Sequence, residues 1–202
     1  TGDSGDGGEI AITAGTSTSA TGTGGRVSIV TGFGSTSTSG ALLLRTHDSG
    51  TAGVSGHLVL STGYATSGNS GALFIGSGPS TVGRGGSVYV TVGSGTSGSG
   101  GEMKLVAGSS SFSTGGRLSV ITGVGGGSTS GALVLQTADA GTAGVSGIAI
   151  LSTGFSSTGN SGSLYIGSGE ASTGRSGSVY VTAGTGDSGD GGEIAITAGT
   201  ST

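Results

Sequence analysis

The chain has 202 residues, of which 51 are glycine and none is cysteine, and its formal net charge is -4. Six Lys and Arg residues are too few to neutralise a phosphate backbone, so the composition argues against a nucleic-acid partner. The absence of Cys excludes disulfides and Cys-ligated zinc, and no run of 18 apolar residues is present that would span a membrane. Regularly spaced Ile, Leu and Val argue against simple disorder.

The sequence repeats itself on a long scale. Residues 1–18 return as residues 185–202, and residues 37–56 have a near copy 91 residues later. We therefore expect one continuous array over 1–202, which contains in chain order the end of a preceding repeat (1–8), a first super-repeat (9–101), a second super-repeat (102–192) and the start of a third (193–202).

Each super-repeat divides into six units of about 15 residues. A glycine, here called the lead glycine, opens every unit: Gly8, Gly25, Gly40, Gly56, Gly71, Gly86, Gly101, Gly116, Gly131, Gly147, Gly162, Gly177 and Gly192. The next six residues form a segment in which the second and fourth positions are apolar, as in Val27 and Ile29. Alternation with period two is typical of a strand. The seventh position, here called the corner, is Gly in eleven of thirteen units; His47 and Ala138 are the exceptions.

These units predict an all-β fold, a parallel β-solenoid (β-helix) of about 15-residue rungs with six rungs per super-repeat, assembled into a fibre. Stacked rungs would bury the second and fourth positions in two columns. Gly at the corners would supply positive φ and close backbone approach. An antiparallel meander, and a disordered or silk-like chain, are the alternatives; the identical orientation of every unit favours parallel stacking.

The third position of each segment faces away from these columns. Four consecutive rungs of each super-repeat are apolar or aromatic there: Leu43, Val59, Phe74 and Tyr89, then Val134, Ile150, Tyr165 and Tyr180. A contiguous apolar patch usually marks an interface. We expect this assembly stripe to pair laterally with another copy of the chain. The alternative is that another part of the coil covers it.

Charged residues fall at equivalent positions of neighbouring rungs. We interpret six of them as register pairs, in which opposite charges prevent slippage of a parallel stack: Glu9, Arg26, Glu102, Arg117, Arg175 and Asp190.

We find no pattern of catalytic or cofactor-binding residues and expect no enzyme. A G-x-G-x-x-G occurs at Gly93, Gly95 and Gly98, and again at Gly184, Gly186 and Gly189, but no helix signal follows either. Two acidic turns form a weak candidate calcium site, with a solvated acidic turn as the alternative; their residues are Asp3, Asp6 and Glu9, with the copies Asp187, Asp190 and Glu193.

Stacked hydroxyl residues open the possibility of ice binding. Thr31, Thr46, Thr62 and Ser77 occupy equivalent positions, as do Thr122, Thr137, Thr153 and Ser168. An ice-binding surface of this kind also needs a second row of threonines beside the first. That row is missing, because the residues two positions earlier in each segment are apolar and predicted to face the core, as at Ile29.

The repeat T-G-x-S-G-x-G-G-x-φ-x-φ resembles solenoid repeats of secreted adhesins and extracellular fibres, and is similar to Gly/Ser/Thr-rich repeats in predicted secreted proteins of algae such as diatoms. The resemblance implies an extracellular location. We expect a structural protein that forms an extracellular filament or matrix fibre by stacking of β-rungs and lateral pairing, with copies of itself as partners. An adhesin, a stalk, or an ice-, glycan- or mineral-binding solenoid is the alternative.

Overall fold

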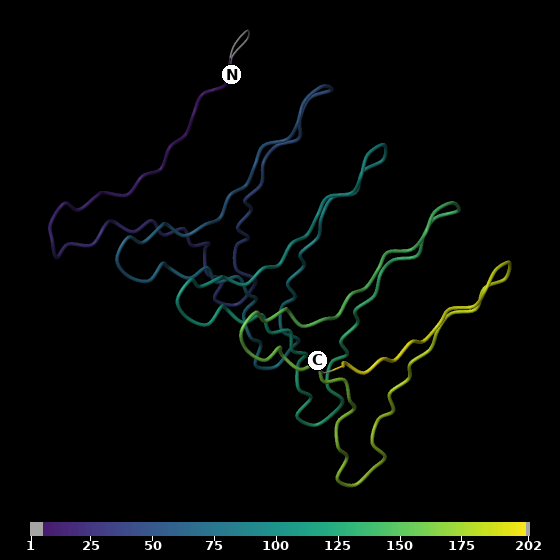
Figure 1. The fold of residues 1–202 in the computed structure, drawn as a ribbon. Helices are drawn as coiled ribbons and strands as arrows, with labels where there is room; N and C mark the ends of the chain where they lie inside the picture. The colour runs from purple at the N-terminus through teal and green to yellow at the C-terminus, as the bar shows by residue number, and fades with distance from the viewer. Residues whose placement is uncertain (1–5, 201–202) are drawn as a thin grey trace. The chain divides into compact units, whose positions relative to one another are not determined.

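The computed structural model describes residues 6–200. Within this range the chain forms no helix and no β-strand (Figure 1). No side chain of these residues is buried. The prediction of an all-β parallel β-solenoid is therefore wrong. The apolar columns of the predicted stack do not form, and their side chains are exposed.

The surface area shows how open the chain is. It exposes 20069 Å². A folded domain of this mass exposes about 8,200 Å², and the corresponding unfolded chain about 27,000 Å². The observed area thus lies closer to the unfolded value than to the folded one, and the large apolar side chains remain in contact with solvent.

The backbone nevertheless turns back at regular intervals. Successive bends lie 15 or 16 residues apart, which is the spacing of most lead glycines. Figure 1 shows the backbone running out to such a tip and returning beside itself, clearly in the last, yellow part of the chain. The twelve bends of the described residues are 19–21, 35–37, 51–53, 66–68, 81–83, 96–98, 111–113, 126–128, 142–144, 157–159, 172–174 and 187–189.

Each bend lies in a loop that runs from a corner residue to the next lead glycine, and we number these loops 1 to 12 in chain order. The two ends of a loop approach closely at a point that we call the neck. A Cβ atom on Gly25 would lie 2.9 Å from the backbone nitrogen of Gly15, and one on Gly86 would lie 2.8 Å from Cβ of Ser77. Glycine is therefore a steric requirement at these two necks, whereas a Cβ on Gly71 or Gly162 would make its nearest contact at 3.5 or 3.6 Å, an ordinary distance.

In six loops the neck is held by a backbone hydrogen bond. The lead-glycine N–H donates to the corner carbonyl at 2.7–3.2 Å: Gly25 to Gly15, Gly40 to Gly32, Gly101 to Gly93, Gly116 to Gly108, Gly131 to Gly123 and Gly192 to Gly184. We call these the closed loops (1, 2, 6, 7, 8 and 12). In the other six, the open loops (3, 4, 5, 9, 10 and 11), no backbone hydrogen bond joins the lead glycine to the corner.

The chain falls into two units, Thr1–Met103 and Lys104–Thr202. The first unit contains loops 1 to 6 and the second contains loops 7 to 12. Taken separately, each unit shows the same order, which is two closed loops, three open loops and one closed loop.

The fifth position of the preceding segment separates the two classes. It is β-branched before every closed loop (Thr13, Val30, Thr91, Val106, Ile121 and Thr182) and never before an open loop (Arg45, Ser61, Gly76, Gln136, Ser152 and Gly167). β-branched residues restrict χ1 and favour extended backbone. Because this position lies two residues before the corner, an extended backbone there helps to direct the corner carbonyl across the neck. A second feature marks closed loops 2, 6, 8 and 12, which have glycine two residues after the corner, whereas no open loop does. A Cβ there would lie within 2.9 Å of a carbonyl oxygen across the bend, at Gly34, Gly95, Gly125 and Gly186.

Within residues 6–200 the repeats of about 15 residues form no strands in either loop class, so the neck hydrogen bond does not decide whether they stack. Each repeat offers few large apolar side chains, and the many glycines of its loop lose the most conformational entropy on ordering. The prediction that the corner glycines have positive φ is also wrong for the described residues. Positive φ occurs at the ends of bends instead, at Gly53 (158°), Gly68 (154°) and Gly144 (140°).

Candidate assembly surface

The segments fall into two kinds of zone. In the apolar zones, residues 41–92 and 132–183, the third position is apolar or aromatic and the first is uncharged. In the charged zones, residues 9–31 and 102–122, the first position is Glu or Arg and the third is Ala, Ser or Lys; a further charged segment starts at Glu193. Every open loop joins two segments of one apolar zone, whereas every closed loop adjoins at least one charged segment.

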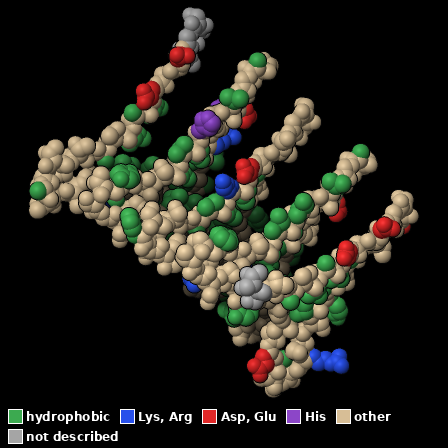
Figure 2. All heavy atoms as spheres, in the orientation of Figure 1, with side chains coloured by type: hydrophobic (Ala, Val, Ile, Leu, Met, Phe, Trp, Pro, Cys, Tyr) green, Lys and Arg blue, Asp and Glu red, His purple; other side chains and the backbone are tan. Residues whose placement is uncertain are grey.

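The assembly stripe is exposed to solvent. Its eight side chains are 71–91 % exposed, and most large side chains at the second position, such as Val27 and Leu42, are 47–60 % exposed. The fourth positions of the apolar zones, which share the face of the second positions, are 57–84 % exposed, so the two faces overlap in exposure. Hydrophobic side chains also reach the surface elsewhere along the chain (Figure 2). Exposure alone therefore does not single out the stripe, and its role as an interface stays a prediction.

The charged zones carry outward apolar residues that sequence reasoning missed. Val30, Val106 and Ile121 occupy the fifth position and are 85 %, 74 % and 85 % exposed. Positions three and five share one face under period-two alternation. The same alternation that predicted the stripe could therefore have found these residues. The outward apolar residue lies two positions closer to the corner in these segments than in the apolar zones.

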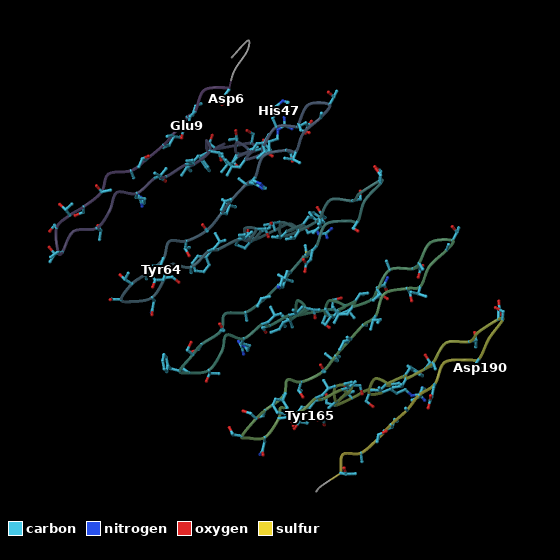
Figure 3. All side chains as sticks on the ribbon, turned by 45° about the horizontal axis from the view of Figure 1, so that its top comes forward. Asp6, Glu9, His47, Tyr64, Tyr165 and Asp190 are labelled. Atoms are coloured by element: carbon cyan, nitrogen blue, oxygen red, sulfur yellow. The ribbon has the colours of Figure 1, made fainter. Side chains whose placement is uncertain are left out.

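All four tyrosines of the chain lie in the apolar zones, and all are strongly exposed: Tyr64, Tyr89, Tyr165 and Tyr180. Figure 3 labels Tyr64 and Tyr165. Tyr64 belongs to open loop 4, where Thr62, Gly63, Ala65, Gly68 and Ser70 line a shallow hollow with it. The aromatic hydroxyls are thus confined to the same zones as the open loops.

Serine hydroxyls make the main side-chain hydrogen bonds. They cap bends, since Ser80 accepts from the N–H of Gly83 at 2.9 Å, and Ser110 and Ser156 act in the same way toward Ser113 and Gly159. In each case the accepting serine is the residue immediately before the bend.

Two further serines act at necks. Ser77 Oγ donates to the carbonyl of Gly86 at 2.7 Å, and Ser168 Oγ donates to the carbonyl of Gly177 at 2.8 Å. A Cβ on Gly56 or Gly71 would likewise meet the methyl group of Thr46 or Thr62. The Thr and Ser residues of the predicted ice-binding row thus lie beside the lead glycines of the loops that follow them. This arrangement gives the ice-binding hypothesis no support.

The register pairs are not joined in the described part of the chain. There, side-chain hydrogen bonds are made by Ser hydroxyls and by His47, and none involves Glu9, Arg26, Glu102, Arg117, Arg175 or Asp190. Because the parallel stack that they were expected to align does not form, their pairing stays a prediction.

The acidic turns are the candidate calcium site. Asp3 lies outside the described residues. Asp6, Glu9 and Asp190 are labelled in Figure 3. Within residues 6–200 no three His, Asp or Glu side chains lie close enough to hold a metal ion. The calcium hypothesis for Asp6, Glu9, Asp187, Asp190 and Glu193 gains no support from this arrangement.

The two G-x-G-x-x-G motifs lie in closed loops. Gly93 and Gly184 are the corners of closed loops 6 and 12, and each accepts the neck hydrogen bond. A Cβ on Gly95 would lie 2.7 Å from the carbonyl oxygen of Gly98, across the bend. Each motif therefore fits the tight course of a closed loop.

No helix in the described part of the chain has the length and apolar character needed to cross a membrane. The resemblance to extracellular repeat proteins stays a prediction. No protein-family model, no curated protein and no solved structure matches this chain.

Proposed function

We propose that this chain is a structural protein of an extracellular filament or matrix, and that it assembles with copies of itself. The observation that carries the proposal is the regular series of large apolar side chains that the chain leaves exposed. Removing apolar surface from water is favourable by about 25 cal/mol per Å². A chain that does not bury these side chains internally gains this free energy by contact with another molecule.

The repeat supports another copy as that molecule. Residues 37–56 and their near copy 91 residues later present almost the same side chains, so a contact made once can recur along the chain. A contact between the first copy of this sequence in one chain and the second copy in the next chain is head-to-tail, and such a contact gives an open filament when it does not close into a ring. The extracellular location rests on the resemblance to secreted fibres and adhesins. No described feature favours a glycan, mineral or ice surface.

Sedimentation and electron microscopy of the purified 202-residue chain test this proposal. We expect concentration-dependent growth into unbranched filaments. A scrambled chain of identical composition is the control, because it keeps the apolar content and removes the spacing. A native chain that stays monomeric at the highest attainable concentration, or a scrambled chain that assembles equally well, contradicts the proposal.

A further inference from the structure

We infer that the apolar zones, residues 41–92 and 132–183, are the surfaces through which copies of this chain contact one another, apolar zone against apolar zone. The charged zones then separate successive contacts. This inference rests on the proposed function and deepens it, because it assigns self-association to one of the two kinds of zone.

The first argument is the charge of the segments. First positions in the apolar zones are uncharged, as at Ala41 and Ala132, and third positions are apolar. The eight segments of these zones carry one Lys, Arg, Asp or Glu residue, Arg45, whose fifth position shares the outward face with the third. The other charged residues of the zones lie in loops: Asp48, Arg84, Asp139, Glu170 and Arg175. A second chain that covers the segments therefore meets one charged group per copy, which must be paired or left in water because burying it unpaired would be costly. The charged zones present Glu or Arg at the first position, so covering them requires a matching charge on the partner.

The second argument is independent and comes from the loops. All six open loops lie inside the apolar zones. Their necks leave the lead-glycine N–H and the corner carbonyl without a bond to each other, as at Gly71 and Gly63. Backbone groups must find partners when they are buried, and unpaired backbone groups beside apolar side chains favour pairing with another chain. Closed necks have already used these groups within their own loop.

The third argument is area. An aromatic side chain buries about 150–250 Å². On that scale the eight exposed stripe side chains together offer on the order of 1,000 Å² per copy, and one zone about half of that. A stable interface needs about 800 Å² per partner. Both apolar zones of a copy must therefore be engaged for stable association.

Two triple variants separate the zones. The apolar-zone variant carries Val59→Thr, Val134→Thr and Ile150→Thr, and the matched control carries Val30→Thr, Val106→Thr and Ile121→Thr, so each variant replaces two Val and one Ile. The replaced side chains are similarly exposed, at 75 %, 71 % and 82 % against 85 %, 74 % and 85 %. Thr keeps the control residues β-branched, as at Thr13 and Thr91 before closed loops, so loop closure is preserved. Neither set removes a buried side chain, because the described residues have no buried core.

The critical concentration for assembly, measured by light scattering and sedimentation, is the readout. We expect the apolar-zone variant to raise it by about tenfold or more, because three side chains lose their contacts with the partner. The control should change it by less than about twofold. Equal effects, or a larger effect of the control, overturn the assignment of the interface while leaving self-assembly intact. A native chain that does not assemble overturns the proposed function itself.

Discussion

Loops 2 and 4 have the same length and the same residues at their two ends, yet one is closed and the other open. Gly32–Gly40 and Gly63–Gly71 both start at a glycine corner, and a threonine precedes each corner. Only the first has the neck hydrogen bond, at 3.0 Å. The fifth position of the preceding segment differs, with Val30 before the closed loop and Ser61 before the open one. Loop 2 also has Gly34 where loop 4 has Ala65, and a Cβ on Gly34 would lie 2.5 Å from the carbonyl oxygen of Thr38. The comparison therefore leaves two differences that can decide closure, the fifth position and the residue two positions after the corner.

The largest effect on closure should come from crowding a neck. In Gly25→Ala the new Cβ would lie 2.9 Å from the backbone nitrogen of Gly15, so the two ends of loop 1 must move apart. Loss of the neck hydrogen bond, worth about 0.5–1.5 kcal/mol, should speed amide exchange at residue 25 by about 2- to 10-fold. Gly15→Ala is the control, because its Cβ would meet nothing within 4 Å. Slow exchange that survives Gly25→Ala contradicts the steric account of the neck.

An exchange of fifth-position residues should convert one loop class into the other. We expect Val30→Ser to speed amide exchange at Gly40 by up to about fivefold, because strand preference spans about 1 kcal/mol. Ser61→Val should slow exchange at Gly71 by a similar factor as loop 4 closes. Amide exchange measured by nuclear magnetic resonance in both variants gives the result.

Val30→Thr is the matched control for this exchange, since Thr is β-branched and precedes three closed loops in the native chain. It should leave the Gly40 amide unchanged. If Ser and Thr at position 30 act alike, the fifth position does not decide closure.

The smallest effect should come from the bends, which both loop classes contain. Ser80→Ala removes the acceptor of the Gly83 N–H, at 2.9 Å in open loop 5. Because this bond is exposed, we expect amide exchange at Gly83 to rise by only about twofold. Ser110→Ala should have the same effect on Ser113 in closed loop 7. A clear difference between these two loops would show that bend and neck are coupled.

The sequence predicts the local course of this backbone better than its tertiary arrangement. Lead glycines such as Gly25 and Gly40 mark the necks, and their spacing returns in the bends. The predicted stack is absent because alternation of apolar residues reports only that one segment suits an extended backbone. Whether two segments pair depends on contacts between distant residues, which no local pattern records. The neck bond of Gly40 to Gly32 joins two residues of one loop and forms without such pairing.

The candidate surface was only partly predictable. The apolar third positions, such as Phe74 and Tyr165, follow from alternation, but their role requires a partner that no single chain contains. Val30, Val106 and Ile121 were missed because the third position alone was followed. The distinction between open and closed loops became visible only with the backbone hydrogen bonds, after which the β-branched fifth position was recognisable in the sequence.

Quenching of tyrosine fluorescence by iodide, before and after assembly, tests the central claim most directly. The chain has no Trp, and all four of its tyrosines lie in the apolar zones, so its intrinsic fluorescence reports on these zones. A matched reporter carries Tyr→Phe at all four positions together with Phe33→Tyr and Phe112→Tyr, which place the fluorophore in closed loops 2 and 7. We predict that assembly shields the native tyrosines from iodide and leaves the reporter tyrosines accessible. Equal shielding in the two proteins, or shielding of the reporter alone, would contradict the assignment of self-association to the apolar zones.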